Sequence, residues 1–352
     1  MINLQDFDFH LDESRIARYP TEKRDESKLM VVDRKSGRIA IEPFFKNIIA
    51  HLYPSDRIFY NETRVSKRRV FLNFTIHRKK DESQFRKHEA LFIESPDNKT
   101  WVCLLKNAKK LKVGDFLTSP SQSVVFQVIE KREKDCILSP NVVIGEEFFE
   151  REGNLPIPPY MKREANNLDE SRYQSIFAKT SGSVAAPTAS LHISEELKQN
   201  LESMGIQFSP ITLDIGYGTF QPISQDDVIK KKLHSEKVSI PQSTIDSWKK
   251  ASTEGSRRIC LGTTTLRALE SMNRFADPHS QSGWKGDTDI FITPNDTIDT
   301  IDGLITNFHL PKSSLLLLVS AFANKELILE AYHKAIENEF RFYSYGDAMI
   351  IV

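Results

Sequence analysis

Two segments of the sequence place a histidine close to hydroxyl or amide side chains, a combination that can bind a polar ligand or move a proton. One contains Thr188 and His192, and the other contains Asn307 and His309. Each segment leads into a predicted helix, where free backbone N–H groups favour anionic or polar ligand groups. A capped loop with a structural histidine is the competing interpretation of both.

Two further segments combine glycine with hydroxyl side chains at the ends of predicted strands. In 213–222, Gly216 and Gly218 flank a tyrosine, which lets a ligand approach the backbone, although a tight turn explains the pattern equally well. In 259–271, Gly262 precedes three threonines at a predicted helix start, which suits a phosphate, a carboxylate or a ribose hydroxyl. Threonine capping is the alternative there. The sequence contains neither a P-loop nor a dinucleotide-binding fingerprint.

The elements that must position these segments change in type along the chain. Short β-type runs between polar turns fill 57–138 and predict a small barrel or sandwich. Strands and helices alternate from about residue 190 onward, which predicts an α/β layer with a mostly parallel sheet. The fold class is therefore mixed α/β, an α/β body with an inserted small β-barrel domain. The predicted domains are 1–60, the N-terminal part of the body; 61–145, the barrel and candidate nucleic-acid-contacting module; and 146–352, the main body with the candidate active site.

Several elements have local signals of their own. Residues 28–42 read as two strands around a turn, and 289–293 (DIFIT) read as a strand. Ser194 can cap a helix that ends before Gly205. Two helices are expected within 312–337, followed by a last strand.

The charge distribution is balanced overall but uneven locally. Lys+Arg and Asp+Glu both number 48, which excludes a wholly basic nucleic-acid binder. From Arg64 to His88, however, nine lysines and arginines stand against two acidic residues. Such a cluster suits the phosphate backbone of RNA, and a solvated barrel surface with paired acids elsewhere is the alternative. The predicted RNA-binding residues are Arg64, Arg68, Arg69, Lys109 and Lys110.

Cysteine usage and hydropathy exclude other classes of protein. Cys103, Cys136 and Cys260 form no CxxC pair and have no zinc-ligand spacing with histidine, so reduced thiols and no metal site are expected. The N-terminus lacks the features of a signal peptide. The longest apolar stretch, 315–323, is far shorter than the roughly 20 residues that cross a bilayer.

Read together, the motifs resemble the S-adenosylmethionine:tRNA ribosyltransferase-isomerase (QueA) family from end to end. The motifs that carry the resemblance are DFDFHLDESRIARYP, NETRV, LPIPPY, SVAAPTASLH, GYGTFQP, GTTTLRALES, LITNFHLPKSSLL and RFYSYGDAMII. The resemblance implies an α/β body with an inserted β-barrel. It also implies transfer of the ribosyl part of S-adenosylmethionine to 7-aminomethyl-7-deazaguanine at the tRNA wobble position. The product is epoxyqueuosine, with adenine and methionine released.

This chemistry requires a base near the ribose C5′ next to the sulfonium, an acid for the departing adenine, and a neutral attacking amine. The predicted catalytic residues are His192, His309, Asp214 and Asp289. The predicted substrate-binding residues are Thr188, Gly216, Gly218, Thr219, Gly262, Thr263, Thr264, Arg267 and Asn307. No cofactor is expected, since S-adenosylmethionine is consumed as a substrate. The implied partners are tRNA and S-adenosylmethionine, and a cytoplasmic monomer with no membrane contact and no stable protein partner is expected.

Three positions depart from the pattern expected of the family. Ser190 stands in place of a glycine, Asp214 in place of a histidine and Gln221 in place of an arginine. Asp214 can still accept a proton, whereas Gln221 cannot offer a charged fork to an anion. Two alternatives follow from these departures. One is a divergent family member that binds tRNA without chemistry, and the other is an enzyme that cleaves S-adenosylmethionine with a different acceptor.

Overall fold

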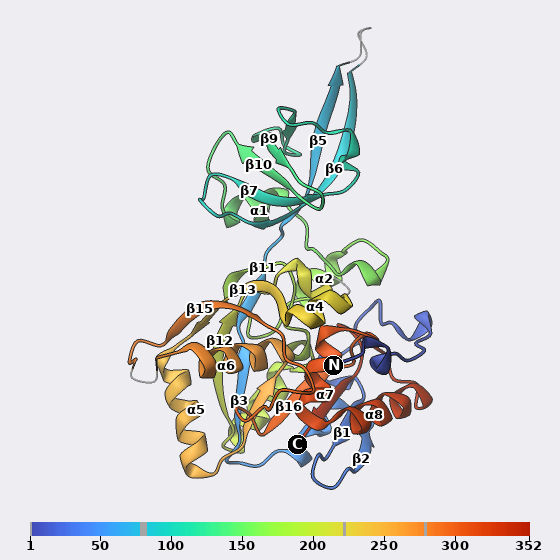
Figure 1. Cartoon of the computed structure of the whole chain (residues 1–352), viewed down its shortest axis with the longest axis vertical. Coiled ribbons are helices and arrows are strands. Elements are labelled where there is room, and N and C mark those ends of the chain that lie inside the picture. The colour runs from blue at the N-terminus through green and yellow to red at the C-terminus, as the bar shows by residue number, and fades with distance from the viewer. Residues whose placement is uncertain (1, 78–82, 221–222, 278–279) are drawn as a thin grey trace.

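The computed structural model describes residues 2–77, 83–220, 223–277 and 280–352. A closed six-stranded barrel stands at one end of the molecule, joined by a narrow neck to a larger body of sheet and helices (Figure 1). The barrel strands come from the middle of the chain, and the body contains both the N-terminal and the C-terminal segments (Figure 1). The chain therefore has the inserted-barrel architecture that the sequence predicts.

A nine-stranded sheet forms the centre of the body. Parallel pairing joins β12, β3, β14 and β16 side by side, and antiparallel pairs adjoin this group on both sides. Further out, β17 and β1 pair in parallel, and β2 and β15 pair antiparallel with their neighbours. The sheet is therefore mixed rather than mostly parallel as expected. In spatial order its strands are β15 (Trp284–Ile290), β13 (Lys232–Ile240), β12 (Gln207–Leu213), β3 (Arg57–Asn61), β14 (Arg258–Leu261), β16 (Gly303–Asn307), β17 (Ala348–Ile351), β1 (Leu29–Val32) and β2 (Ile39–Glu42).

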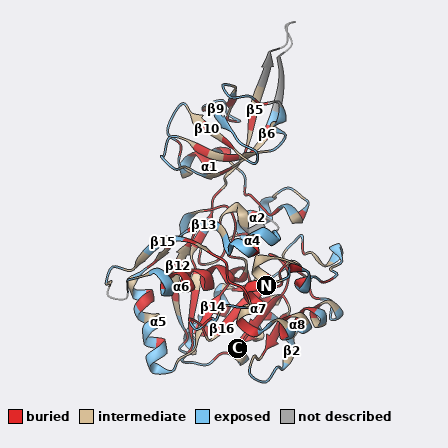
Figure 2. Cartoon of the chain, viewed as in Figure 1, coloured by how far each residue is buried: buried red, intermediate tan, exposed pale blue. Residues whose placement is uncertain are grey.

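Helices cover both faces of this sheet, because its central strands are apolar on both sides. In β3, Phe59 packs into one core and its neighbour Ile58 into the other. Figure 2 shows the resulting buried layer running through the body. The Phe59 core contains residues of α5 (Gln242–Glu254), α6 (Thr263–Phe275), α7 (Ser314–Ala323) and α8 (Lys325–Glu337); the Ile58 core contains residues of η4 (Phe45–His51) and α3 (Glu195–Ser203).

The barrel has a hydrophobic core of its own. Helix α1 (Glu146–Glu152) places Phe148 and Phe149 against Phe92, with ring centroids 6.4 and 5.3 Å from it. The barrel strands are β5 (Arg69–His77), β6 (Ser83–Glu94), β7 (Trp101–Leu105), β8 (Phe116–Thr118), β9 (Val125–Lys131) and β10 (Cys136–Pro140).

A two-stranded parallel sheet lies at the neck, between the barrel and the body. It pairs β4 (Thr63–Val65) with β11 (Thr180–Ser183), so the chain returns beside its point of departure. The remaining elements are α2 (Asn167–Arg172), α4 (Gln225–Lys230) and short 3-10 helices at Leu4–Phe7, Glu13–Arg15, Arg24–Glu26, Ala108–Lys110, Pro159–Met161, Thr188–His192 (η7) and Tyr217–Phe220 (η8).

Most of the elements with clear local signals form as predicted. The β1–β2 hairpin and the Ser194-capped α3 are confirmed. The DIFIT strand was predicted too late, since β15 ends at Ile290, which pairs with Lys232, the first residue of β13. Cys103, Cys136 and Cys260 are free and buried. Within the described ranges, no three His, Cys, Asp or Glu side chains gather as for a metal ion, and no helix could span a membrane.

Candidate active site

A cavity of about 340 Å³ opens where the four candidate segments meet. The loop before η7, the start of α6 and the end of β16 all contribute to its wall. It therefore lies beyond the carboxyl ends of neighbouring parallel strands, the usual place for a ligand in an α/β sheet. The lining residues are Tyr160, 185–189, Ile215, Ile223, 262–264, 306–315, Tyr343 and Ser344.

The start of α6 supplies unpaired polar groups to this wall. Gly262, at φ +98°, allows the sharp turn from β14 into the helix and provides no side-chain cap. The N–H groups of Thr263 and Thr264 belong to the first turn, where no intrahelical acceptor exists. The Oγ1 of Thr264 is buried and has no partner among the described residues. This corner of the cavity can therefore bind a carboxylate or a hydroxyl group.

His309 lines the cavity, and its position is determined by two hydrogen bonds. Its backbone N–H donates to the hydroxyl of Tyr332 at 2.9 Å, and its Nε2 lies 2.9 Å from Oγ1 of Thr306. Among the described residues, no hydrogen bond to Nδ1 is found beside the one that Nε2 makes. Burial lowers the pKa of His309 to about 3, so the imidazole is neutral at pH 7. A neutral ring with an unengaged nitrogen can accept a proton.

His192 lies one contact behind the cavity wall. Its Nε2 is 2.9 Å from Nδ2 of Asn307, which lines the cavity, and its Nδ1 is 2.8 Å from Oγ of Ser27. Burial lowers the pKa of His192 to about 3, and the charges of Arg341 and Arg24 contribute. Both ring nitrogens are occupied by protein partners, so His192 is less available for proton transfer than His309.

The two buried histidines predict a pH-dependent stability. An unfolded histidine titrates near 6.5, so between pH 6.5 and about 3 the unfolded chain binds more protons than the folded chain. The free energy of unfolding should therefore fall as the pH decreases, by about 1 kcal/mol per histidine per pH unit. Urea denaturation at several pH values checks this. His309→Gln should show the shallower pH dependence, and a slope equal to that of the wild type would contradict the argument.

The other two predicted catalytic residues lie elsewhere. Asp214 lies beside the neck, where it accepts a hydrogen bond from Thr63 Oγ1 at 3.2 Å, and burial raises its pKa. Asp289 is half-exposed on β15 and forms an ion pair with Lys232 at 2.9 Å. Neither belongs to the described lining of the cavity. Asp214 and Asp289 therefore do not share the described cavity lining with His309, and their catalytic roles stay predictions.

The predicted binding residues divide into a cavity group and a supporting group. Thr188, Gly262, Thr263, Thr264 and Asn307 line the cavity.

The residues of the supporting group lie outside the described lining of the cavity. Arg267 is buried in an ion pair with Glu236, whose other oxygen accepts the N–H of Gly216 at 3.0 Å. Gly218 packs against the ring of His234, which a Cβ at this position would overlap. These residues shape the loop after β12 rather than the described cavity wall. Gln221 lies outside the described residues, as does the side chain of Thr219.

Two of the candidate tRNA-binding arginines, Arg68 and Arg69, are already paired with carboxylates of the protein. Arg68 donates to the carbonyl of Ile93 and forms an ion pair with Glu146 at 3.0 Å. Arg69 forms an ion pair with Glu89 at 2.9 Å. Both are therefore engaged within the protein, as the alternative interpretation of a paired surface supposes.

Two of the candidate tRNA-binding residues are exposed. Arg64 at the neck and Lys109 on the barrel have no ion pair within the described part of the chain. The side chain of Lys110 lies outside the described residues, as do those of the basic residues at 78–80 and 86. Arg64 and Lys109 are therefore the candidates whose exposed charges are not neutralised by an ion pair among the described residues.

One wall of the cavity, formed by Tyr160, Tyr343 and Ser344, was not predicted as part of the site. Tyr160 and Tyr343 line it with ring centroids 4.2 Å apart, and the hydroxyl of Tyr160 bonds to Ser344. Ser190, which lies on η7 outside the described lining, is also buried and has no partner for its Oγ among the described residues. The LPIPPY and RFYSYGD motifs were the available signal, but their aromatic residues also suit an ordinary core.

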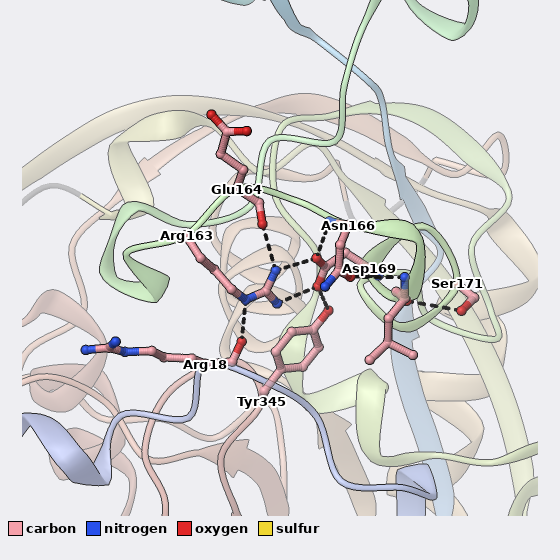
Figure 3. Close-up of polar contacts among 8 residues, drawn as sticks. Arg18, Arg163, Glu164, Asn166, Asp169, Ser171 and Tyr345 are labelled. Atoms are coloured by element: carbon pink, nitrogen blue, oxygen red, sulfur yellow. Dashed lines mark hydrogen bonds and ion pairs between the residues drawn. The ribbon is translucent and has the colours of Figure 1, made fainter.

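A buried ionic cluster anchors this wall from behind (Figure 3). Arg163 bonds both oxygens of Asp169, at 2.6 and 2.8 Å, and the hydroxyl of Tyr345 donates to Asp169 at 2.8 Å. Burial alone raises the pKa of Asp169, but the bonds from Arg163, Asn166 and Tyr345 outweigh it and lower the pKa. The cluster therefore joins 163–169 to the residue after Ser344 in the cavity wall.

A partly open cavity at the strand ends of an α/β sheet, mainly apolar in its lining and with a few buried polar groups, is typical of an enzyme that binds a small substrate. A family model described as queuosine biosynthesis protein matches residues 4–351. The chain belongs to this queuosine biosynthesis family.

Individual relatives match over their full length. The S-adenosylmethionine:tRNA ribosyltransferase-isomerase of Finegoldia magna is 43% identical over 354 residues, covering 99% of this chain and 98% of its own. That of Staphylococcus epidermidis is 41% identical over 357 residues, covering all of both chains. The crystal structure of S-adenosylmethionine tRNA ribosyltransferase from Thermotoga maritima superposes with a TM-score of 0.56 at 30% identity, covering 99% of this chain and all of that one.

Proposed function

We propose that this chain transfers and isomerises the ribosyl moiety of S-adenosylmethionine onto 7-aminomethyl-7-deazaguanine at the tRNA wobble position. The products are epoxyqueuosine in tRNA, adenine and methionine. The observation that carries the proposal is the match to the queuosine biosynthesis family over residues 4–351, which includes every segment of the cavity wall. The enzyme consumes S-adenosylmethionine as a substrate and uses no cofactor. It acts in the cytoplasm as a monomer, without a membrane or a stable protein partner.

The cavity offers matching groups to two parts of S-adenosylmethionine, the carboxylate and the adenine. The first turn of α6, with Thr263 and Thr264, suits the carboxylate of the methionine part. The rings of Tyr160 and Tyr343, tilted by 41° to each other, form an aromatic wall against which adenine can pack. These two features lie on different segments of the same lining, so one bound molecule can reach both.

His309 is the predicted catalytic residue best placed for proton transfer in this reaction. The sulfonium acidifies the adjacent ribose C–H, and the neutral imidazole lining the cavity can accept that proton. The attacking amine of the tRNA base must also be neutral, and it approaches from the open side of the cavity. The reaction breaks the glycosidic bond to adenine and the bond to sulfur, so both leaving groups must be released.

Incubation with precursor-containing tRNA and S-adenosylmethionine, followed by mass spectrometry of the nucleosides, tests the proposed function. Epoxyqueuosine should appear together with stoichiometric adenine and methionine. Binding of tRNA without any product would instead support the non-catalytic alternative. Release of adenine with unmodified tRNA would support a different acceptor.

The exposed cation at the neck gives a prediction about tRNA binding. If Arg64 contacts a phosphate, Arg64→Ala should flatten the plot of log affinity against log salt by about 0.7–0.9, the contribution of one contact. Arg132→Ala is the matched control, because Arg132 is partly exposed but already paired with Glu130. Filter binding across a salt series measures both slopes. Parallel slopes for Arg64→Ala and the wild type would move the tRNA path away from the neck, first to Lys109.

A further inference from the structure

The side-chain amide of Asn307 has only one orientation that satisfies its neighbours. Its Nδ2 lies 2.9 Å from Nε2 of His192 and 3.1 Å from the carbonyl oxygen of Tyr343. A carbonyl oxygen can only accept, so the amide nitrogen, not the amide oxygen, must face Tyr343. Both Nδ2 hydrogens are then used, one on each acceptor.

This orientation also determines the protonation of His192. Because Nε2 accepts from Asn307, the single proton of the neutral ring lies on Nδ1 and is donated to Ser27 Oγ at 2.8 Å. Phe45 stacks on one face of the ring, with ring centroids 5.1 Å apart. His192 is thus bonded at both nitrogens and packed on one face.

The second acceptor for the Asn307 amide is the carbonyl oxygen of Tyr343, a residue with an unfavourable backbone conformation. Its φ of +73° lies in the left-handed region, which a tyrosine rarely adopts. Its N–H donates to the carbonyl of Phe308 at 3.1 Å, which secures this conformation beside the end of β16. Backbone strain of this kind persists where the surrounding structure over-determines it, often at a ligand site.

The remaining atom of the amide, Oδ1, has no partner within the described part of the chain. Asn307 is 2% exposed and is one of the residues that line the cavity, and its Oδ1 is a buried acceptor. A buried acceptor without a donor is costly, and a bound ligand can supply the donor. Neither a carboxylate nor a sulfonium can do so, but an ammonium, an amino group or a hydroxyl can.

We infer that Oδ1 of Asn307 accepts a hydrogen bond from an N–H or O–H group of S-adenosylmethionine, and that His192 is a positioning residue that holds the Asn307 amide. The inference rests on the proposed function, because it takes the ligand from it. It assigns His192 to orientation of the binding site rather than to proton transfer.

Calorimetric titration of S-adenosylmethionine, without tRNA, tests the binding part. Asn307→Leu should weaken binding about 10-fold or more, while Ser320→Ala, an equally buried hydroxyl outside the cavity lining, should leave it unchanged. A wild type that binds S-adenosylmethionine neither alone nor in the presence of tRNA overturns the proposed function together with this inference. Equal binding by the wild type and a folded Asn307→Leu variant overturns the inference alone.

Analogues of S-adenosylmethionine identify the donor. An analogue without the adenine amine or without the α-ammonium should bind the wild type and Asn307→Leu equally if the missing group is the donor. If both analogues still prefer the wild type, a ribose hydroxyl is the donor.

Two variants of His192 test the positioning role and remain informative if Asn307→Leu does not fold. In His192→Gln the amide oxygen can accept from Asn307, so KM and kcat should stay within about threefold of the wild type, with an unchanged pH profile. His192→Leu removes the acceptor and should raise KM about 10-fold. Loss of 100-fold or more in kcat for His192→Gln would make His192 a proton-transfer residue and overturn the assignment.

Discussion

Replacing His309 by alanine should lower turnover by about 100-fold or more, the usual contribution of a positioned acid or base. His309 lines the cavity, is neutral through burial, and leaves Nδ1 without a contact among those of the described residues. Its low pKa has a second consequence. Once protonated, the imidazolium is a strong acid, so it should pass the proton on readily to the departing adenine.

Single-turnover kinetics with saturating tRNA and S-adenosylmethionine measure this loss. His309→Gln keeps a hydrogen-bonding side chain but cannot carry the proton, so it should be as slow as His309→Ala. Binding of S-adenosylmethionine should change much less in both variants, because the prediction concerns a step after binding. Near-normal turnover in either variant would assign His309 to structure.

The pH profile separates this role from that of an ordinary histidine. With a pKa near 3, His309 stays in its neutral form from pH 8 down to about 5. Titration of this residue should therefore not reduce the rate within that range. An ionisation with a pKa near 6.5 in the pH–rate profile of the wild type, absent from that of His309→Gln, would contradict the expected neutral state of His309.

The parts of the site that could be predicted from sequence are those with a local signal. Gly262 followed by threonines, and the TNFH run after a strand, lie at strand–helix junctions, and the sheet brings such junctions to one edge. The mixed fold class could be predicted for the same reason, since strand and helix periodicities are local. β13 escaped prediction because half of its positions are exposed and its apolar residues lie mainly at one end.

The roles of individual side chains could not be predicted, because they depend on partners far away in sequence. His192 and His309 look equivalent in the sequence, and the contacts of His192 to Ser27 and Asn307, 165 and 115 residues away, distinguish them. The basic run that contains Arg68 and Arg69 likewise shows none of the carboxylates that neutralise these two arginines in the fold. Charge counted along the chain therefore overstates the charge that a phosphate can meet.

Asp169 is a buried carboxylate whose loss should strongly lower stability, because it is bonded both to Arg163, six residues away, and to Tyr345, 176 residues away. Asp169→Ala should lower the free energy of unfolding by about 3–5 kcal/mol, the usual cost of removing one partner from a buried ion pair. Arg163 is 11% exposed, so its charge would be left without a counter-ion away from water, and the hydroxyl of Tyr345 would lose its acceptor.

Urea denaturation compares this variant with Asp289→Ala, which removes a half-exposed ion pair and should cost less than about 1 kcal/mol. Equal losses in the two variants would contradict the ranking. Asp169→Asn keeps the shape and one acceptor oxygen, and should fall between them. Since Tyr345 follows Ser344 in the cavity wall, Asp169→Asn should also weaken binding of S-adenosylmethionine, whereas Asp289→Ala should leave it unchanged. Stability and binding lost together in Asp169→Asn would show that the cluster behind the wall maintains the shape of the cavity.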